Sequence, residues 1–284
     1  MKFGVHVSIA GGIFNAPLYA AEVGCETFQM FTRSPRGGAA PKLTTDIVDQ
    51  FKQNCAACGY AEYYVHAPYY INLASAKKKT VHDSIRILRE DLERSSALGV
   101  SALMAHLGSA NELPRDKAIP QTIAALNEIL HGYTGSTRFL IEIAAGAGTV
   151  VGDTFEEVGE LLSGIKHKHV GVCFDTAHAF ASGYDLRTSD DVAQTMQLFH
   201  QHIGIENLTL IHGNDSKVAL GARVDRHQHI GHGHIGSKGF AALINFEPLR
   251  NINMILETPK EDEEGDDWDK VNLAVVKKIR KQST

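Results

Sequence analysis

Long apolar runs are missing from this 284-residue sequence, and no stretch approaches the roughly 18 to 20 apolar residues that a membrane-spanning helix needs. The first residues, MKFGVHVSIAGG, contain no charged segment followed by a long apolar stretch, so we expect no secretory signal. These two absences argue against a membrane protein and against a secreted one. We therefore expect a cytoplasmic protein that binds no membrane.

Cysteine is also scarce, with four residues in the whole chain. A chain of this size with so few cysteines is not a disulfide scaffold, which agrees with a reducing compartment. Cys55 and Cys58 form a CxxC pair, but a zinc ribbon needs a second pair and the sequence has none. We interpret both as ordinary residues of a helix that ends at Gly59.

An excess of positive charge is the third absence, because the formal net charge is −5 with histidine neutral. A nucleic-acid-binding protein usually has a basic surface, so the count alone argues against such a partner. Bound metal ions would change this balance. Three divalent ions would add six positive charges at one place and bring the formal net charge from −5 to +1.

What the sequence does contain is a regular alternation of short apolar runs and longer amphipathic segments. Eight runs are typical of buried strands, at residues 2–8, 27–32, 62–67, 101–108, 138–144, 169–178, 207–215 and 253–259. Eight segments are typical of helices, at residues 15–24, 44–59, 80–99, 114–132, 154–164, 189–204, 238–249 and 267–282.

This alternation predicts an α/β protein with one domain over residues 1–284, a (β/α)8 TIM barrel. A doubly wound open sheet is the alternative, but it usually carries a GxGxxG turn after its first strand. Here the first strand ends in SIAGG, which lacks that pattern and favours the barrel. We interpret the acidic residues 261–267 as a solvated loop before the last helix.

Side chains of the metal-binding type stand at the ends of six consecutive predicted strands, the third to the eighth. Two more follow in the long loop after the seventh strand. The complete set is His66, His106, Glu142, Asp175, His178, His212, Asp225, His227 and Glu257. The carboxyl ends of the strands form the active-site face of a barrel, so we expect a metal site there.

Each of these side chains also has a simpler interpretation, as a hydrogen-bonded core histidine, a helix cap or a surface acid. Carboxylates at the ends of apolar strands are costly to bury without a partner, and a shared group of cations would balance them. Five imidazoles and four carboxylates with no thiolate suit Zn²⁺, with Mn²⁺ or Fe²⁺ as alternatives. At three to four ligands per ion, nine ligands serve about three ions.

The spacing of two ligand pairs refines this prediction. Asp225 and His227 are two apart, so in extended chain they face the same side and can bind one ion. Asp175 and His178 are three apart, so in extended chain they diverge and would serve two different ions. Close metal ions commonly promote displacement at phosphorus.

Several longer motifs then point to a known family. VHAPYYINLAS, VCFDTAHAFASGYD, HGNDSK, GARVDRHQHIGHGHIG and ILETP resemble the endonuclease IV family of apurinic/apyrimidinic (AP) endonucleases. The resemblance runs from GVHVSIAGG near the start to ILETP near the end. It implies a (β/α)8 barrel with three zinc ions, which cleaves DNA 5′ to an abasic site and leaves a 3′-hydroxyl and a 5′-deoxyribose phosphate. It also implies trimming of blocked 3′ ends.

The resemblance assigns the nine residues to three ions. His66, His106 and Glu142 are the implied ligands of the first ion, and Glu142 is the implied bridge to a second. Asp175, His212 and Glu257 complete the second set, and His178, Asp225 and His227 form the third. As the catalytic residue, Glu142 would also orient the attacking water.

The sequence departs from the family pattern in three places. Leu107 follows the second histidine where the family often has proline, and Ala147 stands where a glutamine is common. The second change puts a polar contact near the metals or the phosphate in doubt. The third departure is His232, which takes the central position of a motif that is often GEG. We interpret His229, His232 and His234 as supporting or structural groups rather than ligands.

The implied partner is double-stranded DNA with abasic sites or blocked 3′ ends, bound by a monomer. Arg36, Tyr69 and Tyr70 lie in the loops after the second and third strands, where the family contacts DNA. An aromatic wedge would fill the gap left by a missing base, although both tyrosines could instead pack on the barrel rim. Arg223 and Arg226, on either side of Asp225, are candidates for phosphate contacts.

Two other functions compete with this interpretation. A sugar isomerase or epimerase on the same barrel also places His, Asp and Glu at strand ends, but such enzymes generally use one or two ions and lack the Asp225–His227 pair. A metal-dependent DNA-binding module without catalysis would have no need of a bridging carboxylate. The nine ligands favour the endonuclease.

Overall fold

Eight short parallel strands form the centre of the molecule in a computed structural model that describes residues 1–260 and 267–281. Each predicted apolar run contains one of them. The strands are β1 (Phe3–Val5), β2 (Gln29–Met30), β3 (Tyr64–His66), β4 (Ala102–Ala105), β5 (Arg138–Glu142), β6 (Val170–Asp175), β7 (Leu208–His212) and β10 (Asn253–Leu256). The predicted acidic loop at 261–267 lies outside the described residues, except for its last residue, Asp267.

The sheet closes on itself. Its strand order is β1-β10-β7-β6-β5-β4-β3-β2, so β1 and β2 are its two edges. His6 and Gln29 form a parallel bridge between these edges, and the Val7 amide donates to the Gln29 carbonyl at 2.8 Å. The predicted barrel is therefore confirmed, and an open doubly wound sheet is excluded.

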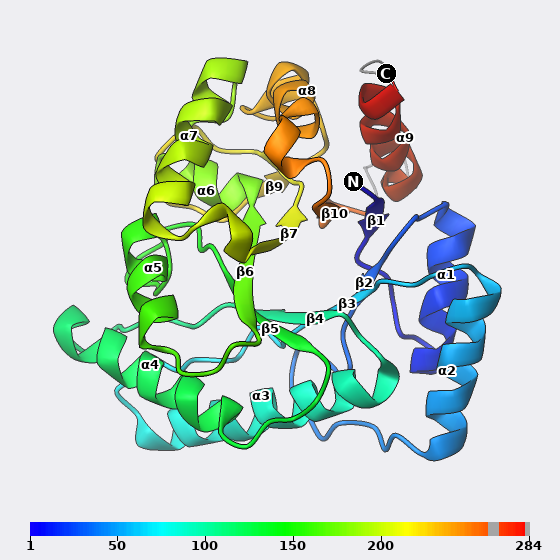
Figure 1. The fold of residues 1–284 in the computed structure, drawn as a ribbon, viewed down its shortest axis with the longest axis vertical. Coiled ribbons are helices and arrows are strands. Elements are labelled where there is room, and N and C mark those ends of the chain that lie inside the picture. The colour runs from blue at the N-terminus through cyan, green and yellow to red at the C-terminus, as the bar shows by residue number, and fades with distance from the viewer. Residues whose placement is uncertain (261–266, 282–284) are drawn as a thin grey trace.

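Helices surround the barrel on the outside (Figure 1). The eight predicted helices are confirmed as α1 (Ala16–Val23), α2 (Thr45–Ala57), α3 (Lys78–Leu98), α4 (Arg115–Leu130), α5 (Phe155–Gly164), α7 (Ser189–His202), α8 (Gly236–Asn245) and α9 (Trp268–Lys281). The hydroxyls of Thr44, Thr154 and Thr188 accept hydrogen bonds from the third amide of the helix that each precedes, as N-caps do. Short 3₁₀ turns occur at Ile13–Asn15, Ile205–Asn207 and Glu247–Leu249.

The strands are apolar because both of their faces are buried. One face packs against the helices, and the other fills the barrel interior with Tyr64, Ala102, Met104, Leu140, Cys173, Leu210 and Ile255. The interior is therefore a packed core rather than a channel. The polar side chains that could form a site therefore lie at the ends of the strands.

Two parts of the chain differ from the sequence prediction. The run at residues 169–178 is not one strand, because β6 ends at Asp175 and a short helix, α6 (Thr176–Ser182), follows at once. The long loop after β7 contains an antiparallel pair, β8 (Asp215–Ser216) and β9 (His227–Gln228). Cys55 lies in α2 and Cys58 is its C-cap, both as free thiols, which confirms the helix interpretation.

No described helix combines the length and the apolar character that crossing a lipid bilayer requires.

A buried ion pair fixes the loop after β2. The Arg33 side chain is 3% exposed, and its Nε donates to Asp91 Oδ1 on α3 at 2.7 Å. Thr32 Oγ1 donates to the same oxygen at 2.8 Å, and Arg94 holds the Thr32 carbonyl at 2.8 Å. This cluster joins α3 to the segment that carries Arg36.

We expect Asp91→Asn to lower the free energy of unfolding by about 3 kcal/mol, because it removes the buried carboxylate beside the Arg33 guanidinium and leaves only the more exposed Glu90 carboxylate, 2.9 Å from Arg33 Nη2. Urea unfolding followed by circular dichroism measures the change. The control is Glu93→Gln on the same helix, which breaks the exposed pair with Arg89 and should cost less than about 1 kcal/mol. An equal decrease in the free energy of unfolding in the two variants would contradict this prediction.

Candidate metal centre

The predicted ligands converge at the carboxyl ends of the barrel strands. A cleft of about 440 Å³ opens there, and its lining includes His66, His106, His178, His227 and Glu257. The described residues form three groups whose ligand atoms lie close enough to share an ion: His66, His106 and Glu142; Glu142, Asp175, His212 and Glu257; and Asp175, His178 and His227. Eight of the nine predicted ligands belong to these groups, which together make a candidate multi-metal site.

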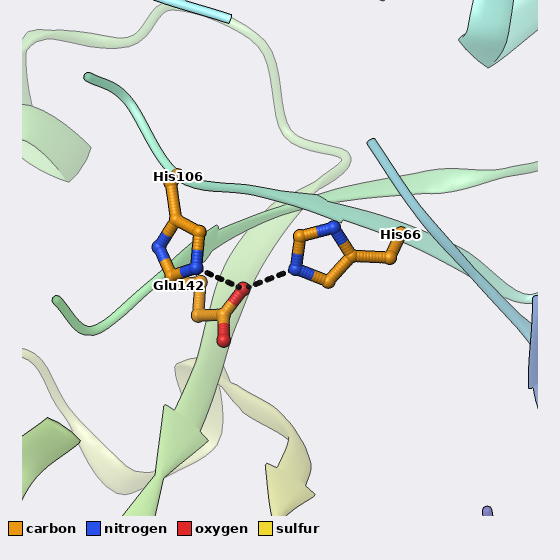
Figure 2. A group of neighbouring side chains, drawn as sticks. All are labelled: His66, His106 and Glu142. Atoms are coloured by element: carbon orange, nitrogen blue, oxygen red, sulfur yellow. Dashed lines mark hydrogen bonds and ion pairs between the residues drawn. The ribbon is translucent and has the colours of Figure 1, made fainter. Parts of the chain in front are cut away.

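The first group joins three different strand ends (Figure 2). Glu142 Oε2 lies 2.9 Å from His66 Nε2 and 3.6 Å from His106 Nε2, so both imidazoles face one carboxylate oxygen. His66 Nδ1 lies 2.6 Å from the Ala67 carbonyl. Because a carbonyl only accepts, Nδ1 carries the hydrogen and Nε2 is directed at the site.

The second group uses the other oxygen of the same carboxylate. Glu142 Oε1 lies 2.8 Å from His212 Nδ1, which is also 3.2 Å from Glu257 Oε2 and 3.8 Å from Asp175 Oδ2. Glu142 therefore presents one oxygen to each group. This is the arrangement that a bridging carboxylate requires.

The ninth predicted ligand, Asp225, is exposed and lies beside the third group without belonging to it. Asp225 Oδ1 is 3.2 Å from His178 Nε2 and 3.3 Å from His227 Nε2, and the two nitrogens are 3.3 Å apart. A tetrahedral ion with bonds of 2.0–2.2 Å has ligand atoms about 3.3–3.6 Å apart. The triangle of donors fits a small divalent ion such as Zn²⁺.

Asp175 has a role that the sequence prediction missed, and the argument that it diverges from His178 in extended chain is wrong. The chain turns into α6 at this point, so Asp175 caps the helix and its Oδ1 accepts from the His178 amide at 2.9 Å. Its Oδ2 lies 3.7 Å from His227 Nε2 and 3.8 Å from His212 Nδ1. Asp175 therefore lies between the second and third groups.

Three polar side chains that the sequence analysis did not single out support the ligands. Gln29 donates to Glu257 Oε1 at 2.6 Å, and its oxygen lies 2.8 Å from His212 Nε2. His6 Nδ1 lies 2.9 Å from the Gln29 amide nitrogen, and Asn214 donates to Asp175 Oδ2 at 2.7 Å. His6 directly follows β1, so the rule that found ligands at six strand ends would have found it. Gln29 begins β2 and is neither a histidine nor a carboxylate, so the same rule misses it.

The buried charges in this site depend on each other. Burial raises the pKa of Glu142, but His106, His212 and His66 outweigh that effect and hold the pKa well below its usual value. Burial lowers the pKa of His178, but the nearby carboxylates outweigh it, Asp175 first, and raise the pKa to about 10. Glu142 is therefore anionic, and its carboxylate needs positive charge beside it.

The glycine-rich stretch at residues 224–236 folds around one buried carboxylate, that of Asp215. Its two oxygens accept hydrogen bonds from the amides of Ser216, Gly231, Gly233, Ile235 and Gly236. A Cβ on Gly233 would lie 2.5 Å from Asp215 Oδ1, so only glycine allows this approach.

The three remaining histidines of the stretch point elsewhere. The His229 ring stacks on Trp268 at 3.8 Å between centroids, and the His232 ring meets Trp268 edge-on at 5.4 Å. His234 is exposed, and its amide donates to the Ser216 carbonyl at 2.8 Å. None of them belongs to a group of candidate ligands among the described residues.

The residues predicted to contact DNA lie near the cleft but not in one cluster. Tyr69 is 68% exposed, lines the cleft, and packs edge-on against Phe31. Arg226 also lines the cleft, whereas Tyr70 lines a separate groove beside Gly37 and Gly38. Arg36 is exposed in the loop after β2, and Arg223 is bound to Asp153 at 2.6 Å.

Comparisons with known proteins identify the family. Residues 17–279 match the family described as the xylose isomerase-like TIM barrel. The chain is 41% identical over 260 residues to a probable endonuclease 4 of Chlorobium phaeobacteroides (strain BS1). The aligned region covers 90% of this chain and 92% of the relative. The chain belongs to the endonuclease IV family. The resemblance seen in the motifs is therefore confirmed.

Another relative and two solved structures match nearly the whole chain. The apurinic-apyrimidinic endonuclease 1 of Saccharomyces cerevisiae is 36% identical over 268 residues, 93% of this chain and 73% of that protein. The crystal structure of endonuclease IV from Thermus thermophilus superimposes with a TM-score of 0.87 at 31% identity, over 99% of this chain and 100% of that one. A D-tagatose 3-epimerase-like protein, at 20% identity and a TM-score of 0.73 over 100% of this chain and 98% of that one, shares the fold alone.

We expect Asp215→Asn to loosen the stretch that follows the Asp225–His227 pair, because an amide has one oxygen where five amides need two. The amides of Gly231, Gly233, Ile235 and Gly236 should exchange hydrogen faster, and the free energy of unfolding should fall by about 1–3 kcal/mol. Hydrogen exchange measured by mass spectrometry reports both the rate and the place. The control is Asp185→Asn, which breaks an exposed pair with Arg187. Unchanged exchange in residues 229–236 would refute the prediction.

Proposed function

We propose that the protein is a zinc-dependent AP endonuclease, which hydrolyses the DNA phosphodiester bond 5′ to an abasic site and leaves a 3′-hydroxyl and a 5′-deoxyribose phosphate. Removal of blocking groups from 3′ ends is proposed as a second activity of the same site. The observation that carries the proposal is Glu142, whose two oxygens face two separate sets of ligands. Membership of the endonuclease IV family supplies the substrate class.

The donor set supports zinc as the metal. His66, His106 and Glu142 would hold one ion, and Glu142, Asp175, His212 and Glu257 a second. His178, Asp225 and His227 would hold a third. Zinc ions supply Lewis acidity toward the phosphate and make a bound water acidic enough to ionise near neutral pH. Imidazole and carboxylate donors without thiolates also accept Mn²⁺ or Fe²⁺.

The residues of the chain supply position and charge. Glu142 is fully buried and ionised, so it holds the two ligand groups at a fixed separation and can orient the attacking water. Gln29 fixes both Glu257 and the His212 ring through hydrogen bonds. The phosphate would reach these groups from the cleft that they line, and we expect a nucleotide turned out of the helix to enter it.

Contacts with DNA are proposed for Arg36, Tyr69, Tyr70, Arg223 and Arg226. Tyr69 and Arg226 have the strongest support, because both are exposed and line the cleft that holds the ligands. A tyrosine ring at the mouth of the cleft would stack in the space of the missing base. One chain supplies every candidate ligand, which supports a monomer, and the substrate would place the protein with the DNA of the cell.

Metal removal and Glu142→Gln test the proposal together. The unaltered protein should nick a duplex with one abasic site, and EDTA treatment followed by dialysis should abolish nicking until zinc is restored. Glu142→Gln removes the charge at nearly constant shape, so kcat should fall by at least about 100-fold while the abasic duplex still binds. Incubation with ketoses provides the control for a sugar isomerase. Full nicking activity after the metal is stripped would refute the proposal.

Tyr69→Ala tests recognition of the lesion. Loss of one stacking contact is worth about 1–3 kcal/mol, so the affinity for the abasic duplex should fall by about 5- to 150-fold. Affinity for an undamaged duplex should change little, as fluorescence anisotropy with both duplexes can measure. Leu198→Ala, at an exposed apolar residue of α7 outside the barrel, is the control and should alter neither affinity. Equal losses on both duplexes would show that Tyr69 does not read the lesion.

A further inference from the structure

Among the three proposed ligands of the third ion, Asp225 is the one that packing does not hold. Its side chain is 54% exposed, whereas those of His178 and His227 are 3% and 16% exposed. It lies on the connection between β8 and β9, where residues 219–226 are all exposed. Something other than burial must place its carboxylate 3.2 Å from His178.

Arg223, two residues before Asp225, is attached to α6 and to the loop after β5. Its amide donates to the Ala181 carbonyl at 2.9 Å, and Ala181 belongs to α6, the helix that carries His178. Its guanidinium donates through Nε to the Gly146 carbonyl at 2.9 Å and through Nη2 to Asp153 Oδ2 at 2.6 Å. The φ of Arg223 is +56°, which is uncommon for a residue with a side chain. The contacts that hold the arginine offset the free-energy cost of this backbone conformation.

Asp153 is suited to hold this arginine because it is itself fixed. Its side chain is only 5% exposed, and its second oxygen accepts from Arg115 Nη2 at 2.9 Å. Arg115 is held in turn by Glu157 and by the Val150 carbonyl at 2.6 Å. A carboxylate buried between two guanidinium groups provides a stronger anchor than an exposed ion pair.

We propose that Arg223 and Asp153 are positioning residues for the third ion, because they hold Asp225 in register with His178 and His227. The two residues from Arg223 to Asp225 span at most about 7 Å, so fixing the first limits where the second can lie. The inference rests on the proposed function and goes beyond it. It gives Arg223 a role in the free protein, before DNA binds, in addition to or in place of a phosphate contact.

The test is the number of zinc ions that each variant holds without DNA. The variants are Arg223→Met and Asp153→Asn, and the matched control is Arg115→Met, which removes the other partner of Asp153 but leaves the Arg223 contact. Each protein is equilibrated with chelator-buffered zinc, and its metal content is measured by mass spectrometry. The thermal midpoint of unfolding is measured alongside.

The unaltered chain should hold three ions, and so should Arg115→Met, although its affinity for the third is lowered less than in Arg223→Met because Asp153 loses one partner but keeps its contact with Arg223. Arg223→Met and Asp153→Asn should hold two tightly, with the affinity for the third lowered by about 10- to 100-fold, as is usual when a group that orients a ligand is lost. Arg223→Lys, which retains one donor, should recover part of that affinity. Selective loss of one ion, with a thermal midpoint no lower than that of Arg115→Met, supports the proposal.

Three ions bound tightly in every variant would overturn the proposal. If Arg223→Met then also bound DNA more weakly, the role of Arg223 would be a phosphate contact only. Loss of all ions together, with a lowered thermal midpoint, would also overturn it, by showing a general loss of folding. Fewer than three ions in the unaltered chain would overturn the proposed three-ion site and this inference with it. That failure is distinct because it is seen without any substitution.

Discussion

The burial of Glu142 is the constraint on which the rest of the site depends. A carboxylate at the end of an apolar strand, with no exposed surface, is stable as an anion only beside compensating positive charge. Histidines on β3 and β7, and one just after β4, provide ligand atoms 2.8–3.6 Å from its two oxygens. The same need applies to Asp175 and to Glu257, whose pKa is held well below its usual value by His212 first. Divalent cations would satisfy all of these carboxylates at once.

The barrel strands position the buried candidate ligands. Three carboxylates position the segments of the site that lie outside the strands of the barrel. Asp215 gathers five amides of the β8 strand and the stretch after β9, and Asp153 holds Arg223 in the connection between them. Asp175 starts the helix that carries His178 while its second oxygen faces the ligands. The loops of the site are therefore organised by charge and hydrogen bonds, whereas the strands are organised by burial.

The sequence was sufficient to predict the barrel and the side chains that meet at its carboxyl end, because both follow from periodic burial. A strand buried on both faces is apolar throughout, so a charged residue at its end, such as Glu142, stands out. The misjudged details depend on local turns instead. Extended geometry was assumed for Asp175 and His178, but an Asp before a helix-forming segment also fits an N-cap. In the same way, the contact between Asp153 and Arg223 joins two loops 70 residues apart, and no motif signals it.

The fold and the chemistry of this protein have separate origins in the chain. The likeness to a D-tagatose 3-epimerase-like protein shows that the barrel alone does not specify a reaction. Strand ends provide the first two groups of ligands, but the third needs α6 and the β8–β9 connection, neither of which is part of the barrel repeat. Contacts that hold α6 and this connection together, such as the Arg223 amide on Ala181, therefore bring the third group of candidate ligands beside the two groups at the strand ends. On this argument the specificity of the enzyme resides in the loops after β6 and β7, and the barrel supplies the rigid base on which they act.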